Sequence, residues 1–99
     1  MIGVEVIGTG SYLPGEPITN EHIAALFGRQ VIWLSEMFGA NCRHFAIDLN
    51  TLQLLPGETN ANMATKAAQR ALLNADIDPV SIDLIVMATS TPDYPFPAT

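Results

Sequence analysis

The chain has 99 residues, a length that fits one small domain, and such a domain buries only about two thirds of the surface that its unfolded chain exposes. Hydrophobic residues make up 48% of the chain and charged residues 14%, well below the roughly 25% that is usual in soluble domains. The ten acidic and four basic residues give a net charge of −6, which argues against nucleic-acid binding. The low charge predicts a larger partner or a missing remainder that covers apolar surface.

The first residues and the cysteine content argue against a secreted protein, a membrane-spanning protein and a disulfide-linked or multi-cysteine metal protein. Residues 1–5 form neither a basic n-region nor a long apolar h-region, and no stretch approaches the roughly 18 apolar residues of a membrane span. We therefore expect a cytoplasmic chain with no membrane partner. The single cysteine, Cys42, excludes an internal disulfide and a multi-cysteine metal site, and neither a metal nor a cofactor is expected.

The first predicted element is a strand at residues 4–7, which is β-branched and runs into a glycine-rich loop. A dinucleotide-binding loop would need a third glycine three residues after Gly10, followed by a helix. Leu13 stands at that position and prolines follow, so the phosphate-loop alternative fails.

Two short helices are predicted next. Thr19 or Asn20 can cap a helix over residues 21–27, and a second helix is expected over 31–38, although its β-branched start weakens the pattern. A glycine directly follows each segment and predicts its end: these are Gly28 and Gly39.

A long helix is the strongest local prediction. Residues 43–47 are expected to form a short strand or an extended link, and 49–58, which contain Pro-Gly, a surface loop. Thr59 then caps a helix over 60–75 whose small residues fall on one buried stripe at helical spacing: Ala64, Ala67, Ala68, Ala71, Leu72 and Ala75. The short side chains predict close approach of a neighbouring backbone.

The last predicted element is a strand covered on both faces. Asp-Pro-containing residues 76–79 break the helix, and residues 84–88 are then continuously apolar, as in a central strand. With the strand at 4–7 this predicts a β-α-β arrangement of two parallel strands in one sheet. Both strands would need further neighbours, because a two-stranded pair is marginal by itself.

The order of these segments resembles the type III β-ketoacyl-ACP synthases. The most specific matches are residues 7–14, Ile-Gly-Thr-Gly-Ser-Tyr-Leu-Pro, and residues 77–99, with Ile-Asp-x-Pro, Ile-Asp-Leu-Ile, Ala-Thr-Ser-Thr-Pro-Asp and Phe-Pro at family spacing. The middle third matches at a few positions, namely Trp33, Gly39, Arg43 and His44. The resemblance implies an α/β fold in which 1–99 is the N-terminal portion of the first half of a thiolase-like fold, a mixed sheet between helices.

The resemblance also implies an activity. Members of the family are homodimers that load an acyl group from an acyl-CoA or acyl-ACP donor onto a cysteine and condense it with malonyl-ACP. Their catalytic cysteine, histidine and asparagine lie beyond the matched segment, so no catalytic residue is expected in this chain, and the chain alone should be inactive.

Trp33 and Phe96 are the substrate-binding residues that the resemblance implies. Trp33 corresponds to the tryptophan that stacks on the adenine of coenzyme A at the tunnel mouth; the alternative is a core tryptophan. Family members place an arginine four residues later, where this chain has Met37, which cannot pair with phosphate. Arg29 is close enough in sequence to substitute. We therefore expect that coenzyme A binds weakly, binds in a different way, or is replaced by a donor carried on ACP.

Phe96 corresponds to the residue that closes the acyl pocket of the partner subunit, the alternative being an aromatic side chain packed in a surface groove. Cys42 stands beside Arg43 and His44, but a lone cysteine is more often a small buried hydrophobe than a nucleophile, and that reading is favoured. Two alternatives to condensation stay open: acyl transfer to a hydroxyl or amine, and a non-catalytic truncated subunit that scaffolds a complementary polypeptide.

Overall fold

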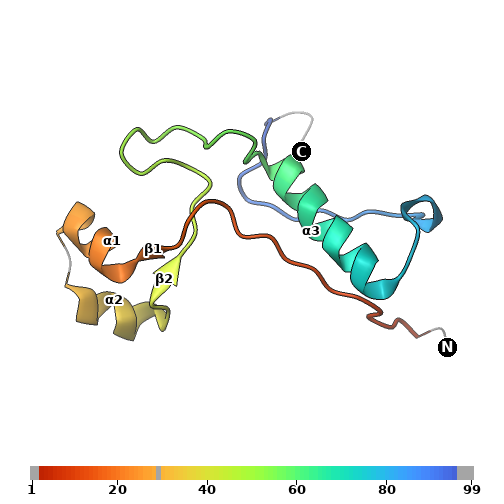
Figure 1. The fold of residues 1–99 in the computed structure, drawn as a ribbon, viewed down its shortest axis with the longest axis horizontal. Helices are drawn as coiled ribbons and strands as arrows, with labels where there is room; N and C mark the ends of the chain where they lie inside the picture. The colour runs from red at the N-terminus through yellow and green to blue at the C-terminus, as the bar shows by residue number, and fades with distance from the viewer. Residues whose placement is uncertain (1–2, 29, 96–99) are drawn as a thin grey trace. The chain divides into compact units, whose positions relative to one another are not determined.

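The computed structural model describes residues 3–28 and 30–95. The chain forms two compact units, and each is described by itself. The helix-pair unit is residues 13–56, and the long-helix unit combines residues 1–12 with 57–99. In chain order the elements are a short strand, two short helices, a second short strand, a long helix and a 3₁₀ turn (Figure 1).

The first helix of the helix-pair unit confirms the predicted end and begins one residue earlier than predicted, with Thr19 and not Asn20 as its cap. Helix α1 spans Asn20–Phe27, and the side chain of Thr19 caps it by accepting a hydrogen bond of 3.2 Å from the amide of His22. Gly28 ends the helix in the left-handed conformation, with φ of 65°, which glycine adopts without a Cβ penalty.

Helix α2 spans Val31–Phe38 and ends at Gly39, again as predicted. Its buried residue Leu34 packs with Ile23 and Ala24 of α1 into the core of this unit. Asn20, which is only 2% exposed, donates its side-chain amide to the Ala40 carbonyl at 2.7 Å. That hydrogen bond ties the start of α1 to the segment after α2.

A short antiparallel pair closes the helix-pair unit. Strand β1, Ile18–Thr19, pairs with β2, Cys42–Arg43, with Ile18 opposite Arg43. Residues 43–47 were predicted as a short strand or an extended link; the strand that forms is the shorter Cys42–Arg43, which begins one residue earlier. The loop at 49–58 is more ordered than predicted, because residues Ile47 and Leu54 form an isolated antiparallel bridge across it.

The long helix confirms the strongest prediction. Helix α3 spans Asn60–Ala75, and the Thr59 hydroxyl accepts a 3.2 Å hydrogen bond from the amide of Asn62. The helix ends where Asp76 takes the left-handed conformation, and the 3₁₀ turn Pro79–Ser81 follows, with the Asp78 carboxylate accepting from the amide of Val80.

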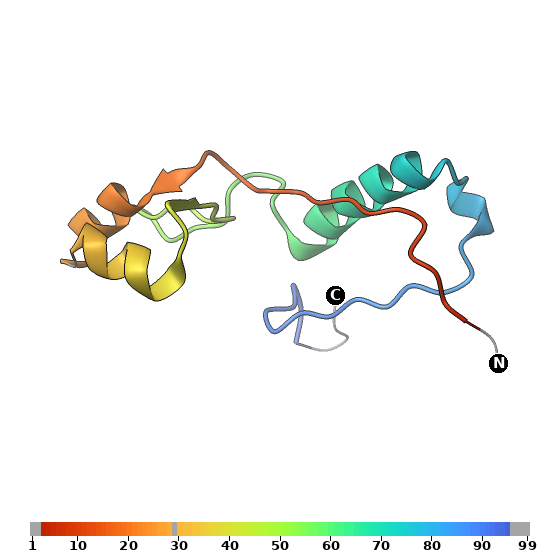
Figure 2. The ribbon, with the colours of Figure 1, turned by 90° about the horizontal axis from the view of Figure 1, so that it is seen from below.

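The alanine stripe of α3 lies against the N-terminal segment, which runs along the helix (Figures 1 and 2). A Cβ placed on Gly10 would lie 2.4 Å from the Ala67 carbonyl oxygen and from the Ala71 amide nitrogen, and one on Gly8 would meet Ala75 at 2.7 Å. The predicted close approach is therefore confirmed. The stripe is not buried as predicted: Ala68 is exposed and its other members are half-buried, because the segment covers only part of the helix surface.

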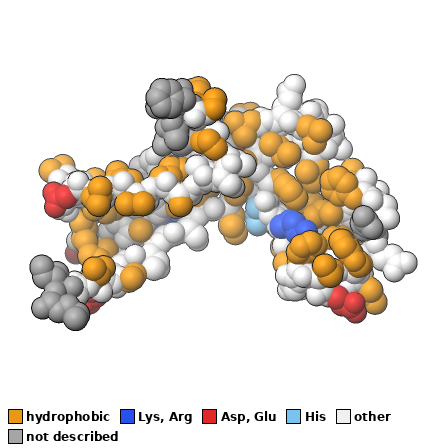
Figure 3. Space-filling model, turned by 180° about the vertical axis from the view of Figure 1, so that it is seen from behind, with side chains coloured by type: hydrophobic (Ala, Val, Ile, Leu, Met, Phe, Trp, Pro, Cys, Tyr) orange, Lys and Arg blue, Asp and Glu red, His pale blue; other side chains and the backbone are white. Residues whose placement is uncertain are grey.

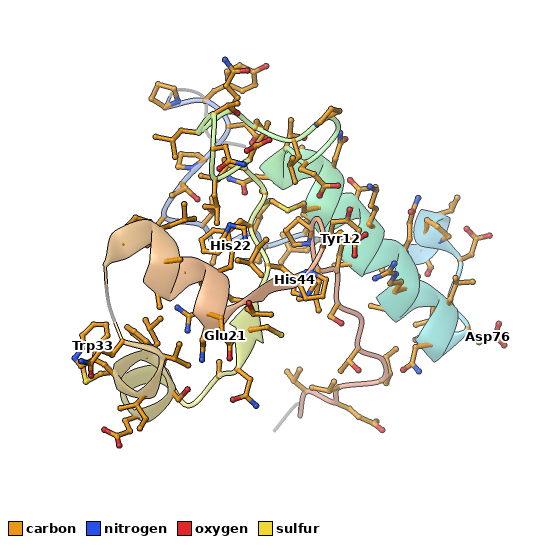
Figure 4. The ribbon with its side chains drawn as sticks, turned by 60° about the vertical axis from the view of Figure 1, so that its left-hand side comes forward. Tyr12, Glu21, His22, Trp33, His44 and Asp76 are labelled. Carbon is orange, nitrogen blue, oxygen red and sulfur yellow. The ribbon has the colours of Figure 1, made fainter. Side chains whose placement is uncertain are left out.

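Polar contacts fix the same segment to α3. The Tyr12 hydroxyl donates to Glu58 Oε1 at 2.6 Å and accepts from Lys66 Nζ at 3.3 Å. Arg70 donates to the Ser11 carbonyl at 2.6 Å. Figure 4 shows Tyr12 lying beside α3. Glu58 is only 9% exposed, so the prediction that residues 49–58 form a surface loop was wrong at this residue.

The two predicted parallel strands are not formed within the described residues. Residues 4–7 and 84–88 form no strand, and strands β1 and β2 form the sheet of the described residues. The reason is physical: a strand is defined by hydrogen bonds to a neighbour, and no neighbour pairs with these segments here. Their apolar side chains are exposed instead, and Val86, for example, is 84% exposed.

Exposed apolar surface predicts self-association of the polypeptide of residues 1–99. Hydrophobic side chains lie open on the surface (Figure 3), and an apolar groove of about 340 Å³ lies between α3 and residues 82–85. Sedimentation velocity should therefore give oligomers or aggregates, because unpaired apolar segments associate. A monodisperse monomer that melts cooperatively would contradict this expectation.

No helix among the described residues is both long enough and apolar enough to cross a membrane.

Candidate functional site

Trp33 lies on the exposed side of α2. The helix turns Leu34 into the core at 3% exposure, while Trp33 is 39% exposed and Met37 is 61% exposed. Because residues four apart share a helix face, Trp33 and Met37 belong to one surface. Figure 4 shows the Trp33 side chain at the edge of the helix-pair unit. The indole thus presents part of its ring to solvent and is not a fully buried core residue.

Two further side chains extend this aromatic surface. The rings of Trp33 and Phe38 meet edge to face, with centroids 6.1 Å apart and an interplanar angle of 85°. The Arg43 guanidinium carbon lies 5.1 Å from the centroid of the Phe38 ring, within the range of a cation–π contact. We call Trp33, Phe38 and Arg43 the aromatic–cation cluster.

Sequence reasoning did not find this cluster as a unit. The sequence singles out Arg43 as a neighbour of Cys42 and as a position of the family resemblance, and Phe38 as a helical residue. The separation of five residues between Phe38 and Arg43, across a glycine-ended helix and into a strand, carries no periodic signal. The tertiary turn after Gly39 brings the guanidinium over the ring.

Met37 leaves the described part of α2 without a cation. The helix Val31–Phe38 contains one charged residue, Glu36, and no basic residue in its last turn. Arg29, the sequence-based substitute, lies outside the described residues.

Phe96 also lies outside the described residues, but the segment that leads to it is held firmly. The Asp93 carboxylate accepts hydrogen bonds from the backbone amides of Asn60 at 2.8 Å and Ala61 at 3.0 Å, at the start of α3. The Asn60 side chain donates to the Thr91 carbonyl. A carboxylate there satisfies amides that the helix leaves unpaired and complements its dipole.

Cys42 is exposed, so the prediction of a buried thiol is wrong. It lies on the two-residue strand β2.

Two other features of the helix-pair unit are His44 and a hollow near it. His44 Nδ1 lies within hydrogen-bonding distance of the Pro14 carbonyl oxygen, at 3.0 Å. A hollow of about 230 Å³ nearby is lined by residues such as His22, Phe45 and Leu55, and Trp33 does not line it. Among residues 3–28 and 30–95, no group of three metal-ligating side chains converges.

Comparison with known proteins finds similarity to condensing enzymes over most of the chain. No protein-family model matches it. It is 46% identical over 94 residues, 95% of its length, to the β-ketoacyl-[acyl-carrier-protein] synthase III of Bradyrhizobium diazoefficiens. Among solved structures it is similar to AbyA1, a tetronic acid condensing enzyme, with a TM-score of 0.77 and 32% identity. It is also similar to 3-oxoacyl-(acyl carrier protein) synthase III, FabH, of Pseudomonas aeruginosa PAO1, with a TM-score of 0.73 and 35% identity.

The solved structures match 94% of this chain, and the chain spans about a quarter of each relative: 26% of the Bradyrhizobium protein, 28% of AbyA1 and 25% of the Pseudomonas enzyme. The fold is therefore an incomplete α/β fold, similar to part of the thiolase-like fold of these condensing enzymes. The chain is similar to about a quarter of a β-ketoacyl-ACP synthase III.

Proposed function

We propose that residues 1–99 are part of an acyltransferase that condenses an acyl thioester primer with malonyl-ACP to give a 3-oxoacyl-ACP, in fatty-acid or related biosynthesis. The proposal rests on the 46% identity, over 95% of the chain, to a β-ketoacyl-ACP synthase III. The likeness to AbyA1 is the reason for including related pathways. The polypeptide of residues 1–99 would be inactive alone, because condensation needs a thiolate, an oxyanion hole and decarboxylating side chains around one carbonyl.

Within the complete enzyme we assign Trp33 to donor binding. Its partial exposure and its edge-to-face contact with Phe38 support this assignment, since a ring fixed by a neighbour can stack on a flat ligand at little entropic cost. We assign the acyl gate to Phe96, next to the segment that Asp93 anchors on α3. The complete enzyme would be a homodimer in the cytoplasm. Sedimentation of the purified enzyme measures its oligomeric state.

The test of the proposed function is an assay of the complete enzyme that contains these residues. Malonyl-ACP should release carbon dioxide only when an acyl primer is present, and 3-oxoacyl-ACP should form in equal amount. Acyl transfer to a hydroxyl or amine without loss of carbon dioxide would support the alternative for which Met37 is the motivating observation. Absence of any acyl transfer would leave the scaffolding alternative.

The Phe96 assignment predicts a change in primer selectivity. In the complete enzyme, Phe96→Ala should admit longer or branched primers while malonyl decarboxylation persists, because removal of the ring opens the closed end of an apolar pocket. Each extra methylene that the primer buries is worth about 0.8 kcal/mol, or nearly fourfold in relative preference. The measurement is kcat/KM across a primer series.

Tyr94→Ala is the matched control, because Tyr94 is an exposed aromatic residue two positions earlier. It should leave the primer ranking unchanged. An identical ranking for wild type and Phe96→Ala would assign Phe96 to surface packing. Mixed dimers of Phe96→Ala with a subunit whose catalytic cysteine is disabled would separate action across the interface from action within one subunit.

A further inference from the structure

We propose that Asp93 is a positioning residue for recognition of the acyl primer, because it holds residues 91–95 on the start of α3. The inference deepens the proposed function and rests on it, since it concerns the primer selectivity that is assigned to Phe96. In this role Asp93 touches neither the primer nor the reacting atoms. It acts through the backbone segment that it fixes.

Both oxygens of the Asp93 carboxylate contact α3. Oδ1 accepts a hydrogen bond of 2.8 Å from the amide of Asn60, and Oδ2 accepts one of 3.0 Å from the amide of Ala61. These amides begin the helix and have no partner within it, and the negative charge complements the positive end of the helix dipole. Because the two bonds end on different atoms of one planar group, the carboxylate cannot turn about either bond without breaking the other.

Asn60 holds the same segment by a second route. Its side-chain amide donates to the Thr91 carbonyl and lies 3.5 Å from the Thr89 hydroxyl oxygen. The Thr91 amide in turn donates to the Thr89 hydroxyl at 3.1 Å. The segment is therefore tied to the first residue of α3 at Thr91 and at Asp93, and Figure 1 shows it beside the start of that helix. Two ties prevent the segment from pivoting on a single contact.

The helix also has a local cap of its own. The Thr59 hydroxyl accepts from the Asn62 amide at 3.2 Å, one turn of backbone away. Asp93 adds acceptors from more than 30 residues away, and thereby orders a segment that loses conformational entropy when it is fixed. The Asp93 contact therefore serves the placement of this segment as well as the helix.

The segment is stiff, so it passes its placement on to the residues that follow. Pro92 and Pro95 flank Asp93, and each proline ring fixes its own φ. The Tyr94 side chain is 68% exposed, and within the described residues Asp93 is the nearest tie to α3 before Phe96. A side chain rejects a longer primer only if the backbone that carries it does not retreat. Release of Asp93 should therefore weaken discrimination by primer length.

The test compares primers in the complete enzyme that contains these residues. We would measure kcat/KM with acetyl, butyryl and hexanoyl thioesters for wild type, Asp93→Ala and Phe96→Ala. Asp93→Ala should raise the hexanoyl-to-acetyl ratio of kcat/KM about threefold or more, in the same direction as Phe96→Ala. The rate of malonyl decarboxylation should stay within about twofold of wild type, because Asp93 does not touch the reacting atoms.

Thr59→Ala is the matched control, since it removes the local cap at the same helix end. It should lower the denaturation midpoint, as Asp93→Ala does, and leave the primer ratio unchanged, because its hydroxyl bonds within the helix start. Asn60→Ala keeps the backbone amide for Asp93 and removes the donor to the Thr91 carbonyl, so it should raise the ratio in the same direction. Asp93→Asn keeps one acceptor oxygen and should fall between wild type and Asp93→Ala. If only Asp93→Asn is soluble, its ratio decides in the same way.

A lower midpoint for Asp93→Ala with an unchanged primer ratio would make the contact purely structural and overturn the inference. An equal change of ratio in Thr59→Ala would overturn it as well. A changed ratio in Phe96→Ala with none in Asp93→Ala would refute this inference and leave the proposed function standing. Absence of 3-oxoacyl-ACP from the wild-type enzyme with every primer would refute the proposed function itself.

Discussion

Replacing Gly10 by alanine should destabilise the enzyme more than any other single-methyl change considered for this chain. The new Cβ would lie 2.4 Å from the Ala67 carbonyl oxygen and 2.4 Å from the Ala71 amide nitrogen. Both atoms belong to the backbone of α3, so relief requires the segment and the helix to separate. Overpacking of this kind costs about 1 to 3 kcal/mol, and the rigid neighbour favours the upper end.

The measurement is the denaturation midpoint of the complete enzyme, with soluble yield as a second readout. Gly3→Ala is the control, because a Cβ at Gly3 meets nothing within 4 Å. Gly8→Ala should fall between the two at a closest approach of 2.7 Å. Equal midpoints for wild type and Gly10→Ala would mean that the N-terminal segment does not lie against α3 as described.

The second large effect concerns Trp33. In the complete enzyme, Trp33→Ala should raise the donor Kd about tenfold, because the proposed stacking of the ring on a flat ligand is worth roughly 1 kcal/mol or more. The melting temperature should change little, because the ring is already 39% exposed. The experiment measures donor binding and thermal unfolding on the same preparation.

Leu34→Ala is the matched control on the neighbouring position of α2. Leu34 is 3% exposed in the core with Ile23 and Ala24, so its truncation should cost about 2 to 5 kcal/mol of stability and leave donor binding by the folded enzyme unchanged. If Trp33→Ala also cost about 3 kcal/mol and spared donor binding, the indole would be a core residue.

The candidate site was only partly predictable. Trp33 was found through the family resemblance, and the structure adds its exposure and its contact with Phe38. Arg43 as a cluster member was not predictable, because its position over Phe38 depends on the path of the chain after Gly39. The roles of Trp33 and Phe96 stay predictions until the binding and selectivity measurements are made.

The sequence by itself determined the helices and their ends. A hydroxyl side chain at Thr19 and at Thr59, and a left-handed glycine after α1 and after α2, act within one turn of backbone, so local pattern suffices to predict them.

Only the tertiary structure decided which segments that are distant in sequence contact one another. The carboxylate of Asp93 meets the amides of Asn60 and Ala61 across more than 30 residues, and Gly10 meets the backbone of α3 across more than 50. The strands expected at residues 4–7 and 84–88 failed to form for the same physical reason. A strand exists through hydrogen bonds to a neighbour, and local sequence encodes the tendency to extend but does not supply the partner.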